Sequence, residues 1–221
     1  MKRRAFLAGA AATAAGRQLI PPARGPIPVA FVLGPHATMI DFAGPWEVFQ
    51  DVMVPERGAT HDEQMPFQLF TVAEQADTLR VTGGMRVTPD YTVANAPQPR
   101  VIVIPAHQGS PRLVDWILSA SARADLTFSV CTGAFHLART GLLRGKTATT
   151  HHQFLDRFAQ EFPDVLVRRG RRFVEHDRVA TAGGLTSGID LALRVVERYF
   201  GRPTAQRTAA YMEYQSTGWI V

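Results

Sequence analysis

The sequence predicts an α/β sandwich in which helices cover a mainly parallel sheet. Short apolar runs alternate along the chain with segments of helical periodicity, which is typical of parallel strands joined by crossover helices. Some runs are aliphatic at every position, as in Val101–Ile104, and such strands are expected to be buried on both faces. The 221 residues are 46% hydrophobic, which excludes a disordered or low-complexity chain, and their number favours a single domain.

The first half of the domain is expected to hold two buried strands, over 28–34 and 67–73, joined by a helix. That helix opens at Gly44–Glu47, with Pro45 in its first turn. Trp46, Phe49 and Met53 follow at helical spacing, which is more typical of a core face than of a binding surface. Further along we expect short β segments within 79–93, a buried strand over 100–105 and a helix over 111–123.

The second half continues the alternation. A buried strand over 126–130 runs directly into a helix that ends near Arg139, with Gly141 as its cap. The remaining expected elements are strands over 146–150, 165–167, 172–175 and 178–181, and helices over 152–161, 187–200 and 203–215.

The N-terminus has the layout of an export signal. Residues 1–16, MKRRAFLAGAAATAAG, join a basic start to an Ala-rich stretch that ends in small residues, and the arginine pair resembles a twin-arginine signal. Residues 17–28 hold four of the 15 prolines and are expected to form a linker, so the domain covers 29–221. We therefore expect a periplasmic or secreted protein; the alternative is a cytoplasmic protein with an N-terminal tail.

Charge and cysteine content limit the partners and cofactors. The net charge of +5 includes three positive residues in the leader, and the cluster Arg168–Arg172 is expected to be a solvated turn, so we expect no nucleic-acid partner. No run of about 18 apolar residues follows the leader, so we expect no membrane span. The single cysteine excludes an internal disulfide, no histidine spacing is typical of a metal site, and we expect neither metal nor cofactor.

The segment 126–138, LTFSVCTGAFHLA, carries the strongest chemical pattern. It places Cys131 at a strand-to-helix turn, the arrangement known as a nucleophile elbow. The N–H groups that begin the helix are expected to lower the pKa of Cys131, and the small residues Thr132 and Gly133 leave room for a substrate. The alternative is a buried, inert cysteine.

Three other segments are expected to reach the same edge of the sheet. Asp41 follows the first strand, where its carboxyl group either satisfies a helix N-terminus or lies beside the Cys131 sulfur and shares one proton with it. His151, in a His-His pair, and His107 each follow a strand and are candidate acid–base partners; the alternative for each is a surface or hydrogen-bonded histidine.

Four motifs together resemble the ThiJ/PfpI superfamily of class I glutamine-amidotransferase-like proteins. The likeness covers about residues 27–219, and its closest branch contains isonitrile hydratases and the ligand domains of AraC-type regulators. The motifs are DFAGPWEVF at 41–49, SVCTG at 129–133, GLLRGKTATTH at 141–151 and TAGGLTSGID at 181–190.

The resemblance implies a flavodoxin-like fold, a homodimer and a cysteine-dependent enzyme acting on a small molecule without a cofactor. Cys131 corresponds to the nucleophile, Asp41 to its acidic partner and Thr132 to the residue after the cysteine in isonitrile hydratases. The implied reaction adds the thiolate to an isonitrile carbon, and water then releases a formamide. Gly44, His107 and Gly133 are the expected substrate-binding residues, and His151 joins the catalytic set.

Two departures from the family pattern affect the expected activity. Thr132 stands where protease-like relatives have histidine, which argues against a peptidase, and Pro105–Gly109 replaces a Pro-Gly-Gly donor loop. The alternative function is a non-catalytic protein that binds a ligand or senses oxidants through Cys131. A helix-turn-helix domain is not expected to fit after the last helix, so we do not expect this chain alone to regulate transcription.

Overall fold

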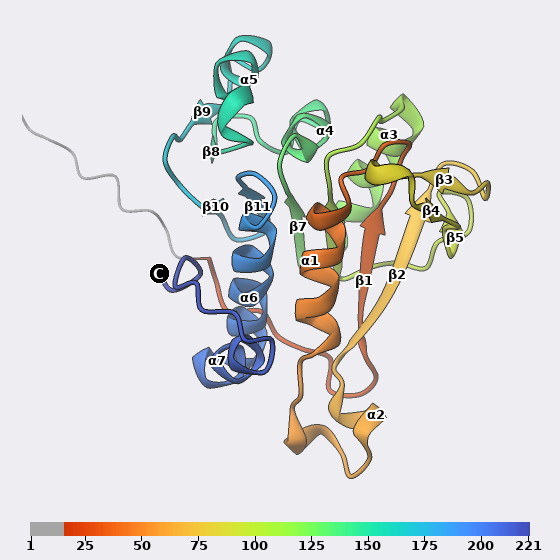
Figure 1. Ribbon diagram of the computed structural model, residues 1–221, viewed down its shortest axis with the longest axis vertical. Coiled ribbons are helices and arrows are strands. Elements are labelled where there is room, and N and C mark those ends of the chain that lie inside the picture. Colours follow the sequence, from red (N-terminus) through yellow and green to blue (C-terminus); the bar gives the residue numbers. More distant parts are fainter. Residues whose placement is uncertain (1–15) are drawn as a thin grey trace, which may run out of the picture.

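A seven-stranded sheet flanked by helices on both faces forms the centre of the molecule (Figure 1). The computed structural model describes residues 16–221. It confirms the predicted flavodoxin-like α/β fold with a mainly parallel sheet. The predicted export signal lies, except for Gly16, outside the described residues, so export and the periplasmic location remain predictions.

The sheet has the strand order β10-β11-β7-β6-β1-β2-β5, and only the pair β10–β11 is antiparallel. The central strands β1, β6, β7 and β11 are almost entirely buried, which explains why their sequences are nearly continuous apolar runs. The strand bounds are β1 Ile27–Val32, β2 Phe67–Ala73, β5 Tyr91–Thr92, β6 Val101–Ile104, β7 Leu126–Ser129, β10 Phe173–Glu175 and β11 Val179–Ala182.

Two helical layers cover the sheet. On one face α1 (Met39–Gln50) packs against α6 (Ser187–Phe200), which in turn packs against α7 (Arg202–Tyr211). On the other face lie α3 (Pro111–Ser121) and α4 (Gly133–Arg139). Each layer closes a separate apolar core against the sheet, so the strand ends between the layers are the natural place for a site.

Smaller elements extend from this sandwich. A hairpin of β3 (Leu79–Arg80) and β4 (Arg86–Val87) lies beyond the β5 edge, and a separate parallel pair consists of β8 (Thr147–Ala148) and β9 (Leu166–Val167). The strand expected over 146–150 is therefore short and outside the main sheet. The other elements are α2 (His61–Gln64), α5 (Leu155–Glu161) and 3₁₀ turns at Pro55–Arg57, Thr82–Gly84 and His152–Phe154.

Two helix boundaries differ from the prediction. Helix α1 begins at Met39, five residues before the expected start, so Asp41 lies in its first turn instead of before it. Contacts that are distant in sequence fix this start: the Thr38 N–H donates to the Ala106 carbonyl at 2.8 Å, and the Met39 N–H donates to Thr82 Oγ1 at 2.9 Å. Helix α7 ends at Tyr211 rather than near 215, because the chain turns at Glu213, whose φ is +52°.

The segment expected to be a linker lies on the domain. Leu19 is buried, and its N–H donates to the Arg198 carbonyl at 2.8 Å. Strand β1 already begins at Ile27. Among residues 16–221 no helix combines the length and apolar character that a membrane crossing requires.

Gly133 offers a direct test of how the elbow is packed. A Cβ at this position would lie 2.0 Å from the Ile104 carbonyl oxygen, so we expect Gly133→Ala to lower the free energy of unfolding by more than about 3 kcal/mol. Urea denaturation measures the change.

Gly170→Ala is the matched control for Gly133→Ala. Gly170 has a φ of +69° but open space around it, so its replacement should cost only about 1 kcal/mol of backbone strain. A smaller loss for Gly133→Ala than for Gly170→Ala would show that α4 does not press on the end of β6.

Candidate active site

Cys131 forms the turn between β7 and α4 with a left-handed backbone, at a φ of +58°. Its N–H donates to the Gly183 carbonyl at 2.7 Å, and its own carbonyl accepts from Thr150 Oγ1 at 2.8 Å. These two bonds hold a conformation that is strained for a residue with a side chain, which is typical of functional turns. The residue is only 7% exposed.

Asp41 reaches the cysteine from the first turn of α1. Its carboxyl group is fully buried, and Oδ2 accepts from the Ala106 N–H at 3.1 Å, at the end of β6. Oδ1 has no hydrogen bond of good geometry. The carboxyl group and the Cys131 thiol interact directly, as each shifts the pKa of the other. The structure thus brings together the two groups that the sequence paired.

Burial dominates the protonation of this pair. It raises the pKa of Asp41 to about 7, against the smaller effects of the Ala106 N–H, the Cys131 thiol and the Leu185 N–H. Burial, together with the negative charge of Asp41, raises the pKa of Cys131 to about 12. At pH values between these two pKa values, Asp41 and Cys131 together hold one proton.

The expected lowered pKa of Cys131 is therefore wrong. The N–H groups of Thr132 and Leu185 do favour the thiolate, but burial and the neighbouring carboxylate outweigh them. The sulfur therefore carries the proton, and a thiolate forms only when Asp41 accepts that proton.

The two glycines expected to bind substrate have packing roles. Gly133 lets the start of α4 press against the carbonyl groups of Ile104 and Pro105. Gly44 lies at the crossing of α1 and α6, where a Cβ would come within 2.8 Å of Ile189. Thr132 is half-buried at the start of α4. Its backbone N–H favours the thiolate form of Cys131.

His107 and His151 lie outside the thiol–carboxyl pair. His107 bonds through Nδ1 to the Pro105 carbonyl at 2.9 Å and stacks on His136 of α4, with ring centroids 4.3 Å apart. Burial, helped by His136, lowers the pKa of His107 to about 3, so the ring is neutral. No histidine is among the groups that shift the pKa of Cys131 or Asp41.

His151 packs against the loop that follows β11. Its ring packs where a Cβ on Gly184 would lie, and Nδ1 accepts from the Gln153 N–H at 3.3 Å. Burial and the neighbouring His152 lower the pKa of His151, which favours a neutral ring.

Sequence reasoning missed the loop 183–186 as a functional element. Gly183 accepts from the Cys131 N–H, and Leu185, at a φ of +52°, directs its N–H toward the thiol–carboxyl pair. The motif TAGGLTSGID contained this loop, but its contribution is made by backbone atoms, which a search for reactive side chains does not find.

An ion pair between a buried carboxylate and an exposed arginine supports the same loop. Asp190, at the end of that motif, is fully buried and pairs with Arg172, which also donates to Thr186 Oγ1 at 3.2 Å. The hydroxyl groups of Tyr214 and Ser216 donate to the other Asp190 oxygen at 3.2 and 3.1 Å. The ion pair thus joins the 183–186 loop to the segment that follows α7.

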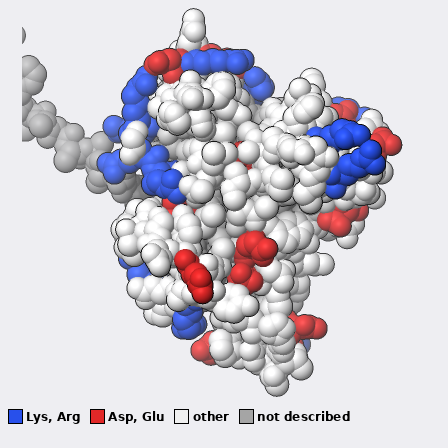
Figure 2. All heavy atoms as spheres, in the orientation of Figure 1, with Lys and Arg blue, Asp and Glu red and all other residues white. Residues whose placement is uncertain are grey.

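On the face shown in Figure 2, basic side chains run across the top and down the left, over α5 and the β9–β10 segment, and gather again at the right, over the β3–β4 hairpin. In the cluster 168–172, Arg169 pairs with Asp156 and Arg172 with Asp190. Within residues 16–221, no three histidine, cysteine or acidic side chains gather as metal ligands.

Comparisons with known proteins find chains of similar sequence and fold. The sequence model of the DJ-1/PfpI family matches residues 28–198. Isonitrile hydratase of Pseudomonas putida is 31% identical over 196 residues, covering 84% of this chain and 78% of that protein. The HTH-type transcriptional regulator GbdR of Pseudomonas aeruginosa is 27% identical, covering 89% of this chain but only 53% of the regulator. A ThiJ/PfpI family protein from Pseudomonas syringae aligns with a TM-score of 0.74 at 24% identity, covering 87% of this chain and 76% of that one.

The proton shared by Asp41 and Cys131 predicts how the thiol reacts. We expect alkylation of Cys131 by iodoacetamide to have a pH midpoint above the ordinary value of about 8.5. In Asp41→Asn the negative neighbour is removed, so the midpoint should fall by about one unit or more. Mass spectrometry of alkylation rates at a series of pH values measures both midpoints.

Thr132→Ser is the control for the alkylation experiment, because it keeps both the backbone N–H and the carboxylate and should leave the midpoint unchanged. An unshifted or higher midpoint in Asp41→Asn would contradict direct coupling of the two groups.

Proposed function

The chain belongs to the DJ-1/PfpI family, and on this premise we propose that it is a cysteine-dependent hydratase that converts isonitriles to N-substituted formamides. The observation that carries the proposal is the buried pair of Cys131 and Asp41, which holds a single proton near neutral pH. The likeness to isonitrile hydratase of Pseudomonas putida supports the choice of substrate.

In the first step, the sulfur and the proton of the Cys131 thiol both add to the terminal carbon of the isonitrile. Asp41, as carboxylate, accepts the Cys131 proton while the sulfur bonds to the carbon, and the same proton then passes from Asp41 to that carbon. The product is a thioimidate, with sulfur, hydrogen and a C=N double bond on one carbon. A carboxyl group with a pKa of about 7 is well matched to accept and return a proton at neutral pH.

The second step hydrolyses the thioimidate. Asp41 takes a proton from water as the oxygen attacks the carbon, and passes this proton to the nitrogen. The carbon–sulfur bond of the tetrahedral intermediate then breaks as its hydroxyl proton passes through Asp41 to the sulfur, and the formamide leaves. The overall change is the addition of one water to the isonitrile, so no oxidant, metal or cofactor is required.

Backbone donors assist the sulfur in both steps. The N–H groups of Thr132 and Leu185 favour the charged sulfur as it attacks and as it leaves.

Oxidation sensing or ligand binding by Cys131 is the second candidate function, and the likeness to the regulator GbdR favours it. A peroxide sensor needs a thiolate before the oxidant arrives. The raised pKa of Cys131 leaves little thiolate at neutral pH for an oxidant to meet. The hydratase reaction needs no standing thiolate, because Asp41 accepts the proton while the sulfur bonds to the substrate carbon. The homodimer remains a prediction from the family resemblance.

Hydration of a simple alkyl isonitrile tests the proposal. We expect turnover to formamide by the intact protein, none by Cys131→Ala, and a loss of about 100-fold or more in Asp41→Asn, because general acid–base catalysis contributes at least this much. Gas chromatography or NMR measures the formamide.

Met85→Ala is the control, because this exposed residue lies on the β3–β4 hairpin and should leave the rate unchanged. No turnover by the intact protein, together with peroxide oxidation of Cys131 at micromolar concentrations, would favour the sensor instead.

The pH dependence of hydration follows from the role of Asp41 as proton acceptor. Because the carboxylate form accumulates above its pKa, kcat/KM should rise with pH through about 7 and then level off. Initial rates between about pH 5 and 9 measure the profile. Asp41→Glu should keep a rising limb and Asp41→Asn should lose it; a rate that falls as the pH rises through 7 would contradict this role.

A further inference from the structure

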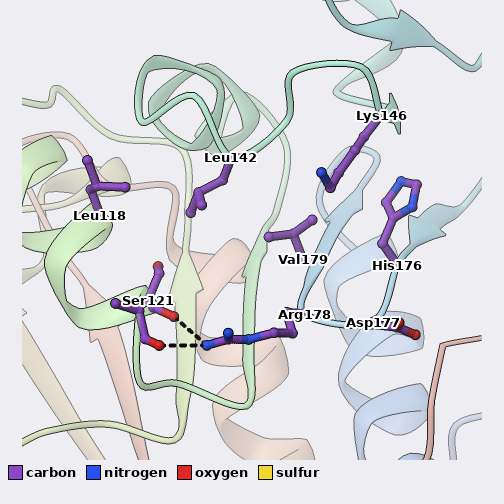
Figure 3. A pocket seen from close by; sticks show the side chains of 9 residues that line it. Leu118, Ser121, Leu142, Lys146, His176, Asp177, Arg178 and Val179 are labelled. Atoms are coloured by element: carbon purple, nitrogen blue, oxygen red, sulfur yellow. Dashed lines mark hydrogen bonds between the residues drawn. The ribbon is translucent and has the colours of Figure 1, made fainter.

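A cavity lies at the opposite end of the sheet from Cys131. It has a volume of about 550 Å³, within the range of small-molecule sites. Its walls come from the end of α3, the loop before β8, and the β10–β11 turn with the start of β11 (Figure 3). Cys131 follows the carboxyl end of β7, whereas this cavity lies beside the amino end of β11, and none of its lining residues contacts the thiol–carboxyl pair.

The cavity combines an apolar wall with positively charged groups. Leu118, Leu142 and Val179 form the apolar part, and Leu118 is 45% exposed although it is a large aliphatic side chain. Such a surface, with a few polar groups converging on it, is typical of a binding site for an organic molecule.

Lys146 is the first of the charged groups. It is one of only two lysines among the 24 basic residues. Its side chain runs from the loop before β8 toward the cavity, with the nitrogen leading (Figure 3). Within residues 16–221 it forms no ion pair and no side-chain hydrogen bond, so its ammonium group is available to a ligand.

Arg178 is the second charged group, and its position is fixed. One of its terminal nitrogens donates to the carbonyl groups of Ser121 and Ala122 at the end of α3, at 3.0 and 2.8 Å (Figure 3). These bonds satisfy the negative end of the helix, while the charge of Arg178 stays at the cavity. Asp177, also on the wall, accepts from the Arg17 N–H at 3.3 Å. The lining thus carries two permanent positive charges and one negative charge.

We propose that this cavity binds a small amphipathic monoanion: a carboxylate with a short apolar chain. The carboxylate bonds to Lys146, and the chain lies along Leu118, Leu142 and Val179. One net positive charge in the lining matches one negative charge on the ligand. The site is independent of the proposed hydratase reaction.

Binding of hexanoate to the full chain tests this proposal. Isothermal titration calorimetry or ligand-observed NMR should detect hexanoate binding, but not binding of hexylammonium, which has the same chain and the opposite charge. Lys146→Gln should weaken hexanoate binding by about tenfold or more, because a charge-assisted hydrogen bond is lost. Leu118→Trp, at an exposed position, should also weaken binding by filling the apolar part.

Arg144→Gln and Cys131→Ala are the matched controls. Arg144 is an exposed cation two residues before Lys146 and does not line the cavity, so its replacement should change the dissociation constant by less than about twofold. Cys131→Ala should leave hexanoate binding intact. Three results would overturn the proposal: no binding up to about 10 mM, equal binding by Lys146→Gln, or loss of binding in Cys131→Ala.

Discussion

Two acidic groups that share one proton in a water-poor place are the constraint around which this structure is arranged. A buried carboxylate and a buried thiolate cannot persist side by side, so the surroundings of Asp41 and Cys131 decide where the proton resides. The surroundings consist of backbone groups from three segments: Ala106 after β6, Gly183 and Leu185 after β11, and Thr132 at the start of α4. Backbone N–H and carbonyl groups do not titrate, so they hold the pair without adding another proton.

Much of the fold followed from the sequence because the signals were local. The aliphatic runs of β1, β6 and β7 are buried on both faces, and the strand-to-helix turn at Cys131 leaves a clear trace in its own residues. The meeting of Asp41 and Cys131 was also predictable, since both follow parallel strands and such strand ends converge. The start of α1 was not, because Ala106 and Thr82 fix it from elsewhere in the chain.

The chemistry of the site was harder to predict than its location. The helix-terminus argument gave the wrong direction for the pKa of Cys131, because the depth of burial and the charge of Asp41 depend on packing that no local pattern encodes. The roles of the motif glycines also depend on packing that no local pattern encodes. Gly44 and Gly133 stand in the family motifs, yet neighbouring side chains and carbonyl groups fill the space beside them. A glycine in such a motif can serve the active site through close packing alone.

The bonds from Tyr214 and Ser216 to Asp190 tie the C-terminal segment to the loop that lies beside Cys131. Arg172 holds the other Asp190 oxygen and also Thr186, so one carboxylate joins three stretches of chain that are distant in sequence. A truncation before Tyr214 would leave one oxygen of this fully buried carboxylate without its hydroxyl partners. The last few residues of the chain are therefore part of the domain and not a removable tail.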